Sequence, residues 1–133
     1  MRCAVVSVSR EGAELGQSVR DALGGEMARA ADKACIQYRM LNRGAESGGE
    51  ARLFQRTFAL TEEIFPRYDG ILYIMAAGIA VRAVAPHIVS KASDPAVLVM
   101  DECGKHCISL LSGHLGGANA WAREVAAAVG ADP

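Results

Sequence analysis

Short apolar runs and longer stretches with helical periodicity alternate along this chain. The apolar runs are rich in Val, Ile, Leu and Ala and have polar residues at their ends, which is typical of strands buried on both faces of a sheet. The predicted strands are residues 3–8, 34–41, 70–76, 96–100 and 107–111, of which 34–41 has the weakest pattern.

Helices are predicted between these strands. Leu15, Val19 and Leu23 recur at every fourth residue, so we expect a helix over residues 13–23 that ends at Gly24-Gly25. Further helices are predicted over 54–65, where Thr61 is an alternative helix start, from near Gly78 to Ala85, and over 118–129 with Gly130 at its end. Residues 42–50 have the glycine content of a loop.

Strands that alternate with helices predict a single α/β domain over residues 1–133. We expect a three-layer sandwich with a mostly parallel sheet, of the Rossmann or flavodoxin-like type. A chain of 133 residues suffices for one compact domain of this kind. Ligands of such sheets bind beyond the carboxyl ends of the strands, and this rule points to residues 76–78, 101–102 and 111–119.

The amino-acid composition argues against several classes of protein. Hydrophobic residues make up 51% and charged residues 22%, so a mainly disordered chain is excluded. The net charge of -1 argues against a surface that coats nucleic acid or an anionic membrane. There is no apolar stretch of the roughly 18–20 residues needed to span a bilayer and no leader-like pattern after Met1-Arg2, so we expect a cytoplasmic protein with reduced thiols. Cys3 and Cys35 are expected to act as small buried hydrophobes.

A glycine-rich segment, SGHLGGAN at residues 112–119, follows a predicted strand and precedes a predicted helix. Its glycines let the backbone approach a ligand closely and leave amide donors at the helix N-terminus, as in an anion cradle. The segment has neither the ending of a Walker A loop nor the spacing of a dinucleotide fingerprint. A tight turn in which Ser112 or Asn119 caps the helix explains it equally well.

A second predicted strand end has similar chemistry. Gly78 would permit a tight turn, and Arg82, one helical turn further on, could clamp a carboxylate with both guanidinium nitrogens. The alternative is an arginine on the solvated face of a helix.

The histidines all lie in the second half of the chain, at His87, His106 and His114. A neutral imidazole can act as a general base near neutral pH. His114 is the strongest candidate because it lies inside the glycine-rich segment.

The spacing of Cys103, His106 and Cys107 invites a metal-binding interpretation. A structural zinc site needs four ligands, usually from two paired segments, and this run supplies only part of such a set. We therefore predict no metal site, and instead a turn in which Gly104 has a positive φ.

The run YDGILYIMAAGIAVR at residues 68–82 resembles the opening motif of the N-terminal domain of the CbiG family, which acts in anaerobic cobalamin biosynthesis. The resemblance is strong over residues 65–131 and loose before them. It continues through Ala85-Pro86, Lys91, residues 94–97, Asp101-Glu102, Gly104 and the unusual run ISLLSGHLGGAN at 108–119.

This resemblance implies a cobalt-precorrin-5A hydrolase, an enzyme that opens the δ-lactone of cobalt-precorrin-5A and releases acetaldehyde to give cobalt-precorrin-5B. The reaction needs a base for water, donors for the developing oxyanion and cations for peripheral carboxylates. Residue chemistry and position in the motif suggest His114 as the base and the turn amides as oxyanion donors. Arg82 and Lys91 would hold acetate or propionate arms, and Asp94 or Asp101 would orient His114 or a water. The candidate catalytic residues are His114, Ser112 and Asp101, and the candidate substrate-binding residues are Gly78, Arg82, Lys91, Asp94, Gly113, Gly116, Gly117 and Asn119.

Two other functions remain open at this stage. The chain could be a non-catalytic tetrapyrrole-binding domain of that enzyme, or a generic phosphate- or nucleotide-binding α/β module. The corrinoid substrate carries its own cobalt, so the resemblance implies no cofactor from the protein. The expected partner is the cobalt corrinoid, not nucleic acid or a membrane. Homo-oligomerisation is left open, and further domains are expected to follow this one in the full-length protein.

Overall fold

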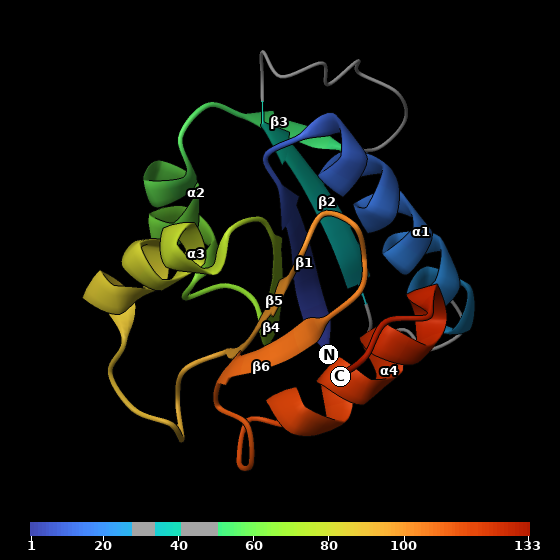
Figure 1. Cartoon of the computed structure of the whole chain (residues 1–133). Coiled ribbons are helices and arrows are strands. Elements are labelled where there is room, and N and C mark those ends of the chain that lie inside the picture. The colour runs from blue at the N-terminus through green and yellow to red at the C-terminus, as the bar shows by residue number, and fades with distance from the viewer. Residues whose placement is uncertain (28–33, 41–50) are drawn as a thin grey trace.

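Within the residues that the structure describes, six strands form one sheet in the order β3-β2-β1-β4-β5-β6 (Figure 1). The structure is a computed structural model that describes residues 1–27, 34–40 and 51–133. The loop predicted at 42–50 and the side chain of Cys35 lie outside this description. The strands are β1 (Arg2–Ser7), β2 (Ala34–Met40), β3 (Arg52–Phe54), β4 (Gly70–Ile74), β5 (Ala96–Met100) and β6 (Cys107–Leu111). The helices are α1 (Arg10–Met27), α2 (Thr57–Ile64), α3 (Ala77–Val84), the 3₁₀ helix η1 (Ala85–His87) and α4 (Ala118–Val129).

The first five strands of the sheet are parallel, and β6 is antiparallel to β5. The strand order is that of the doubly wound dinucleotide-binding fold. The reversal of β6 follows from the length of its connection. Residues 101–106 are too few for the crossover that a parallel strand requires, so β5 and β6 form a hairpin. The predicted α/β sandwich with a mostly parallel sheet is confirmed.

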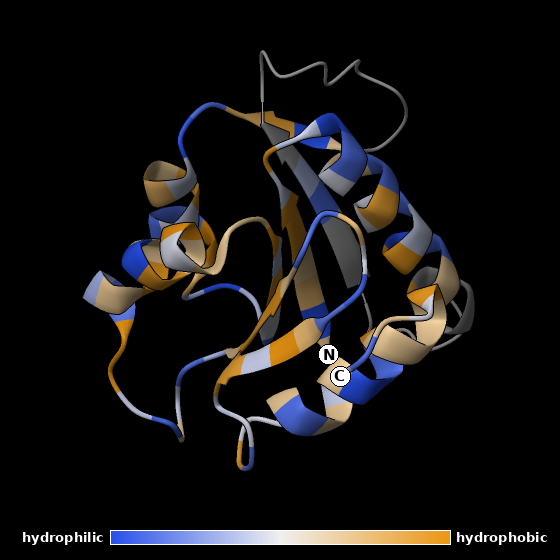
Figure 2. Cartoon of the chain, viewed as in Figure 1, coloured by the Kyte–Doolittle hydropathy of each residue, from blue (hydrophilic) through white to orange (hydrophobic). Residues whose placement is uncertain are grey.

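Helices cover both faces of the sheet, with α1 and α4 on one face and α2 and α3 on the other (Figure 1). Side chains of β4 alternate between the two resulting cores: Ile71 and Tyr73 pack on the α2–α3 side, and Leu72 and Ile74 on the α1–α4 side. Figure 2 shows hydrophobic residues along the strands at the centre of the sheet. Cys3 is fully buried in the α1–α4 core, as a small hydrophobe would be. Among the described helices, none has the length and apolar character needed to cross a membrane.

The predicted boundaries of two helices, α1 and α2, are wrong. Phe54 belongs to β3, and the helix begins only at Thr57. A strand of three residues is too short to show an alternating pattern. Thr61 lies inside α2, where its hydroxyl is 2.9 Å from that of Tyr73, and does not start a second helix. Helix α1 continues to Met27, past the predicted end at Gly24-Gly25, because glycine costs a helix only about 1 kcal/mol per residue.

The end of the described chain lies against the start of β6. Helix α4 ends at Gly130, which has a φ of 74°, as the sequence predicts. Asp132 then pairs with His106 in parallel. The N–H of Cys107 donates to the Asp132 carbonyl at 2.8 Å, and the Asp132 N–H donates to the Lys105 carbonyl at 2.7 Å. Residues 131–133 therefore form one wall beside β6.

Candidate functional site

The antiparallel direction of β6 divides the predicted site between two edges of the sheet. Residues 76–78 and Asp101 follow β4 and β5 at the carboxyl edge of the parallel strands. Val97 lies opposite Leu111 and Met100 opposite Cys107, so residues 112–119 begin at the other edge, level with the start of β5. We call this the amino edge. The expectation that residues 111–119 lie at the carboxyl edge is wrong.

Two loops meet at the amino edge. The loop of residues 88–95 leads into β5, and the glycine-rich turn, residues 112–117, leaves β6. The Ser112 hydroxyl donates to the carbonyl oxygen of Asp94 at 3.3 Å. The Asp94 carboxylate accepts the N–H groups of Val89 at 2.9 Å and Ser90 at 3.0 Å, so it holds its own loop in place. The structure thus brings Asp94 and Ser112 together, with Lys91 exposed on the same loop.

The glycine-rich turn satisfies part of its own hydrogen bonding. The N–H groups of Ala118 and Asn119 donate to the carbonyls of Ser112 and Gly113 at 3.1 and 3.0 Å. Two amides in the first turn of α4 are therefore not free for an anion. Gly117 is the N-cap with a φ of 79° and no side-chain cap, so the expected capping by Ser112 or Asn119 side chains is wrong.

Close packing explains Gly113 and Gly116 of this turn, whereas Gly117 has open space around it and a positive φ. An ideal Cβ on Gly116 would lie 2.5 Å from the Ser112 Cβ, and one on Gly113 would lie 2.7 Å from the Asn119 Oδ1. Ser112 itself has a φ of 58°, a left-handed conformation that is uncommon for residues other than glycine. His114 is exposed, and its imidazole has no hydrogen-bond partner in the described part of the chain.

Gly78 and Arg82 lie together near the carboxyl edge. An ideal Cβ on Gly78 would be 3.5 Å from Arg82 Nη1, so the guanidinium folds back along α3. Gly78 is part of α3 and not of a tight turn, which corrects the expected reason for a glycine there. Arg82 is exposed on its helix, in agreement with the solvated alternative.

Asp101 organises the turn between β5 and β6. Its carboxylate accepts the N–H of His106 at 2.7 Å, that of Lys105 at 3.1 Å and that of Cys103 at 3.1 Å. Slight desolvation alone would raise the pKa of Asp101, but these hydrogen bonds hold it below its ordinary value. Gly104 has a φ of 67°, as predicted for this turn.

Asp101 lies far from the other two candidate catalytic residues. The length of β5, at roughly 3.3 Å per residue, separates it from Ser112 and His114 by about 15 Å. The structure therefore does not bring Asp101 into contact with His114, and of the acidic candidates it leaves only Asp94 at the amino edge.

The cysteines near this turn differ in exposure. Cys103 is exposed and Cys107 is buried, and burial raises the pKa of the Cys107 thiol to about 11. Among the described residues, no three His, Cys, Asp or Glu side chains are placed to hold a metal ion.

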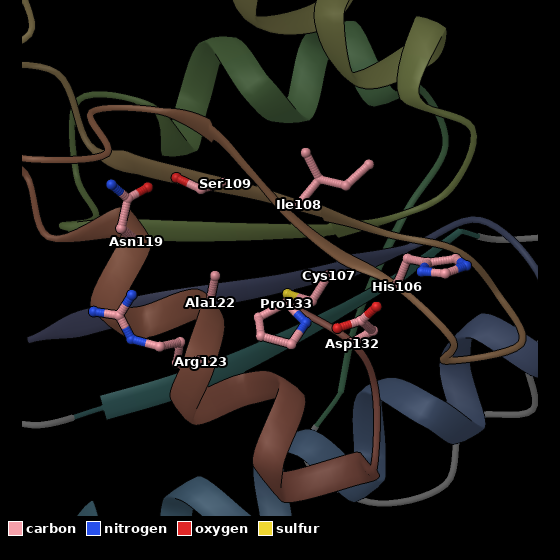
Figure 3. Close-up of a pocket in the computed structure, with 9 residues that line it drawn as sticks. All are labelled: His106, Cys107, Ile108, Ser109, Asn119, Ala122, Arg123, Asp132 and Pro133. Carbon is pink, nitrogen blue, oxygen red and sulfur yellow. The ribbon is translucent and has the colours of Figure 1, made fainter.

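A pocket of about 500 Å³ lies between β6 and α4 (Figure 3). Figure 3 shows Asn119 and Arg123 of α4 at one end of it and His106 and Asp132 at the other. The lining residues are His106, Cys107, Ile108, Ser109, Asn119, Ala122, Arg123, Asp132 and Pro133. Sequence reasoning found Asn119 but missed Arg123. The i, i+4 spacing of the two polar residues in an Ala-rich helix was the available signal.

A second cavity, of about 540 Å³, lies beside the 88–95 loop. Its lining includes Val89 and Asp94 from that loop and His87, whose ring stacks on Phe65 with 5.7 Å between the centroids. The amino edge therefore has concave surface on this side of the two loops as well.

Fold and site together define a doubly wound α/β domain with a candidate ligand-binding edge at the amino ends of its parallel strands. Sequence comparison identifies the family. Residues 59–133 match the family described as cobalamin synthesis G N-terminal, and the chain belongs to it.

Relatives of this chain agree with that assignment. The chain is 54% identical to the cobalt-precorrin-5A hydrolase of Salmonella typhimurium over 81 residues. These residues make up 60% of this chain and 23% of that protein. Over 132 residues it is 35% identical to the enzyme of the same name from Priestia megaterium, covering 98% of this chain and 33% of that one. The chain thus spans a third or less of these relatives. Their names support a role in cobalamin biosynthesis.

Solved structures show the same fold. A cobalamin biosynthesis protein G homologue from Sulfolobus solfataricus superimposes with a TM-score of 0.74 at 27% identity, over 98% of this chain and 35% of that one. A homoserine dehydrogenase from S. aureus matches at a TM-score of 0.52 and 12% identity, over 94% of this chain and 31% of that one, which shows the fold alone.

Proposed function

We propose that this chain is the N-terminal part of a cobalt-precorrin-5A hydrolase. That enzyme opens the δ-lactone of cobalt-precorrin-5A and releases acetaldehyde to give cobalt-precorrin-5B. The observation that carries the proposal is that the family match over residues 59–133 contains both loops that meet at the amino edge. Two relatives named for this activity support it.

The surface of the amino edge suits a corrinoid, which has a flat apolar macrocycle with carboxylates around it. Val89 is 83% and Leu115 67% exposed, so the tips of both loops present apolar side chains to solvent. Lys91 and His114 lie on the same two loops and offer cationic or proton-accepting groups. Cobalt enters as part of the substrate.

The proposed reaction has two steps. Water attacks the lactone carbonyl carbon, the ring C–O bond breaks, and the ring oxygen leaves as a hydroxyl group. The bond between the macrocycle and the hydroxyl-bearing two-carbon unit then breaks, the hydroxyl proton is lost, and acetaldehyde leaves while the electron pair stays with the ring carbon. We assign water deprotonation to His114 and oxyanion stabilisation to the N–H groups of the glycine-rich turn that remain free, while the Ser112 hydroxyl holds the turn against the 88–95 loop.

Carboxylate binding at this edge is assigned to Lys91. Asp94 positions both loops through its contacts with Val89, Ser90 and Ser112. Arg82 and Asp101 lie towards the carboxyl edge, so this arrangement gives them no direct role in lactone opening.

A second candidate function is binding of the tetrapyrrole without chemistry. Two observations favour it. The N–H groups of Ala118 and Asn119 already donate hydrogen bonds to carbonyls of the turn, and Asp101 lies far from His114. In that case this chain docks the substrate, and another part of the enzyme supplies the catalytic groups.

Acetaldehyde release tests both functions. We expect His114→Ala in the full-length hydrolase to abolish acetaldehyde release, while the exposed site leaves the unfolding free energy within about 0.5 kcal/mol of wild type. Glu11→Ala removes an exposed side chain from the first turn of α1, at the opposite edge, and is the control, with activity retained. Near-normal release by His114→Ala would exclude the proposed base. Corrinoid binding by this chain without turnover would then favour the binding function.

A further inference from the structure

We propose that the pocket between β6 and α4 binds a carboxylate side chain of the corrinoid through Arg123 and Asn119. The inference rests on the proposed function and extends it from the two loops to the neighbouring pocket. It names a specificity-determining residue, Arg123, that the sequence motif did not include.

The pocket is continuous with the glycine-rich turn through Asn119. The Asn119 side chain packs against Gly113, since an ideal Cβ there would lie 2.7 Å from Oδ1, and the same residue lines the pocket. Arg123 follows one helical turn later on the same face of α4 (Figure 3). A macrocycle over the turn would therefore carry a peripheral arm of a few bonds into this pocket.

Charge in the pocket favours an anionic group at the α4 end. Arg123 is exposed and forms no ion pair within the part of the chain that the structure describes. The one acidic side chain that lines the pocket, Asp132, lies at the opposite end beside His106 (Figure 3). A guanidinium presents two parallel N–H donors that match a carboxylate, and the Asn119 amide and Ser109 hydroxyl add further donors.

The rest of the lining suits the methylene part of such an arm. Ala122, Cys107 and Pro133 are apolar and line the pocket (Figure 3). A volume of about 500 Å³ is ample for an acetate or propionate substituent. We assign the pocket to one such substituent, beside the apolar tips of the two loops.

Titration of this chain with two corrinoids tests the inference. The probes are cobyrinic acid, whose peripheral groups are free carboxylates, and its fully methyl-esterified form. We expect Arg123→Gln to weaken binding of cobyrinic acid about tenfold or more and to leave the ester within about twofold. Arg123→Lys keeps the charge but loses the planar fork, and should recover only part of the affinity. Arg56→Gln is the matched control, an exposed arginine just before α2 at the carboxyl edge, and should change neither affinity.

Each outcome of the titration supports or overturns the proposed carboxylate subsite. Selective loss for the free acid supports the subsite. Equal loss for both corrinoids, equal loss in Arg56→Gln, or unchanged binding in Arg123→Gln overturns it. Absence of any corrinoid binding to the wild-type chain overturns it too, whereas the proposed reaction is judged separately by acetaldehyde release from the full-length hydrolase. Melting temperatures confirm that the exposed substitutions leave the fold intact.

Discussion

At the residue scale, the candidate catalytic carboxylate of Asp101 stabilises the turn between β5 and β6. Three backbone N–H groups hold its pKa below the ordinary 3.8, so its contribution to stability is fully present above that value. It is lost as pH falls through the lower, folded-state pKa, because protonation removes the acceptor. We expect Asp101→Ala to cost about 1 kcal/mol at pH 7 and progressively less below about pH 4. Urea unfolding between pH 7 and pH values below about 4 measures this cost, and Glu102→Ala at the neighbouring residue is the control. A cost of Asp101→Ala that did not change with pH would contradict the role of the ionised carboxylate in this turn.

Two glycines of the predicted site, Gly116 and Gly78, differ in the space available for an added Cβ. Gly116→Ala should cost about 1–3 kcal/mol, because the new Cβ meets the Cβ and carbonyl of Ser112 at 2.5 and 2.9 Å, and neither is a flexible end. Gly78→Ala should keep or raise stability by about 0.4–1 kcal/mol, because Gly78 is helical and its Cβ would have ordinary contacts. Paired denaturation curves test the contrast, and equal stabilities of the two variants would refute it.

At the element scale, apolar runs predict where strands lie more reliably than which way they run. The strands predicted at 96–100 and 107–111 match β5 and β6, yet the glycine-rich turn lies at the amino edge and not at the expected carboxyl edge. The rule that ligands bind at the carboxyl ends holds for parallel strands, whereas β5 and β6 form a hairpin, as their short connection indicates. The contact of Ser112 with Asp94 joins residues on either side of that hairpin, and no local pattern reports it. The family motif, in contrast, was readable directly from residues 68–82 and 108–119.

Helix α4 depends on one large side chain for its packing on the sheet. Trp121 is 4% exposed, and an ideal Cβ on Gly70 would lie 2.8 Å from its indole. We expect Trp121→Ala to cost about 3–5 kcal/mol and Gly70→Ala about 1–3 kcal/mol. Glu124→Ala, on the exposed side of α4, should remain within about 0.5 kcal/mol. Circular dichroism in urea measures all three. Wild-type stability in Gly70→Ala would mean that the indole does not pack across β4.

At the scale of the whole molecule, the sheet separates the candidate residues into two energetically independent groups. Asp101 acts in its own turn at the carboxyl edge, whereas Ser112 contacts Asp94 at the amino edge, about 15 Å away. Sites this far apart without shared partners contribute additively, and sites in one hydrogen-bonded network do not.

A pair of double-mutant cycles tests this division. The unfolding free energies of Asp101→Ala and Ser112→Ala should add within about 0.5 kcal/mol. Asp94→Ala and Ser112→Ala should deviate from additivity by about 0.5 kcal/mol or more, because the Asp94 carboxylate holds the loop whose carbonyl accepts the Ser112 hydroxyl. Coupling between Asp101 and Ser112 as large as that between Asp94 and Ser112 would contradict the antiparallel placement of β6. It would return Asp101 to the group of candidate residues at the amino edge.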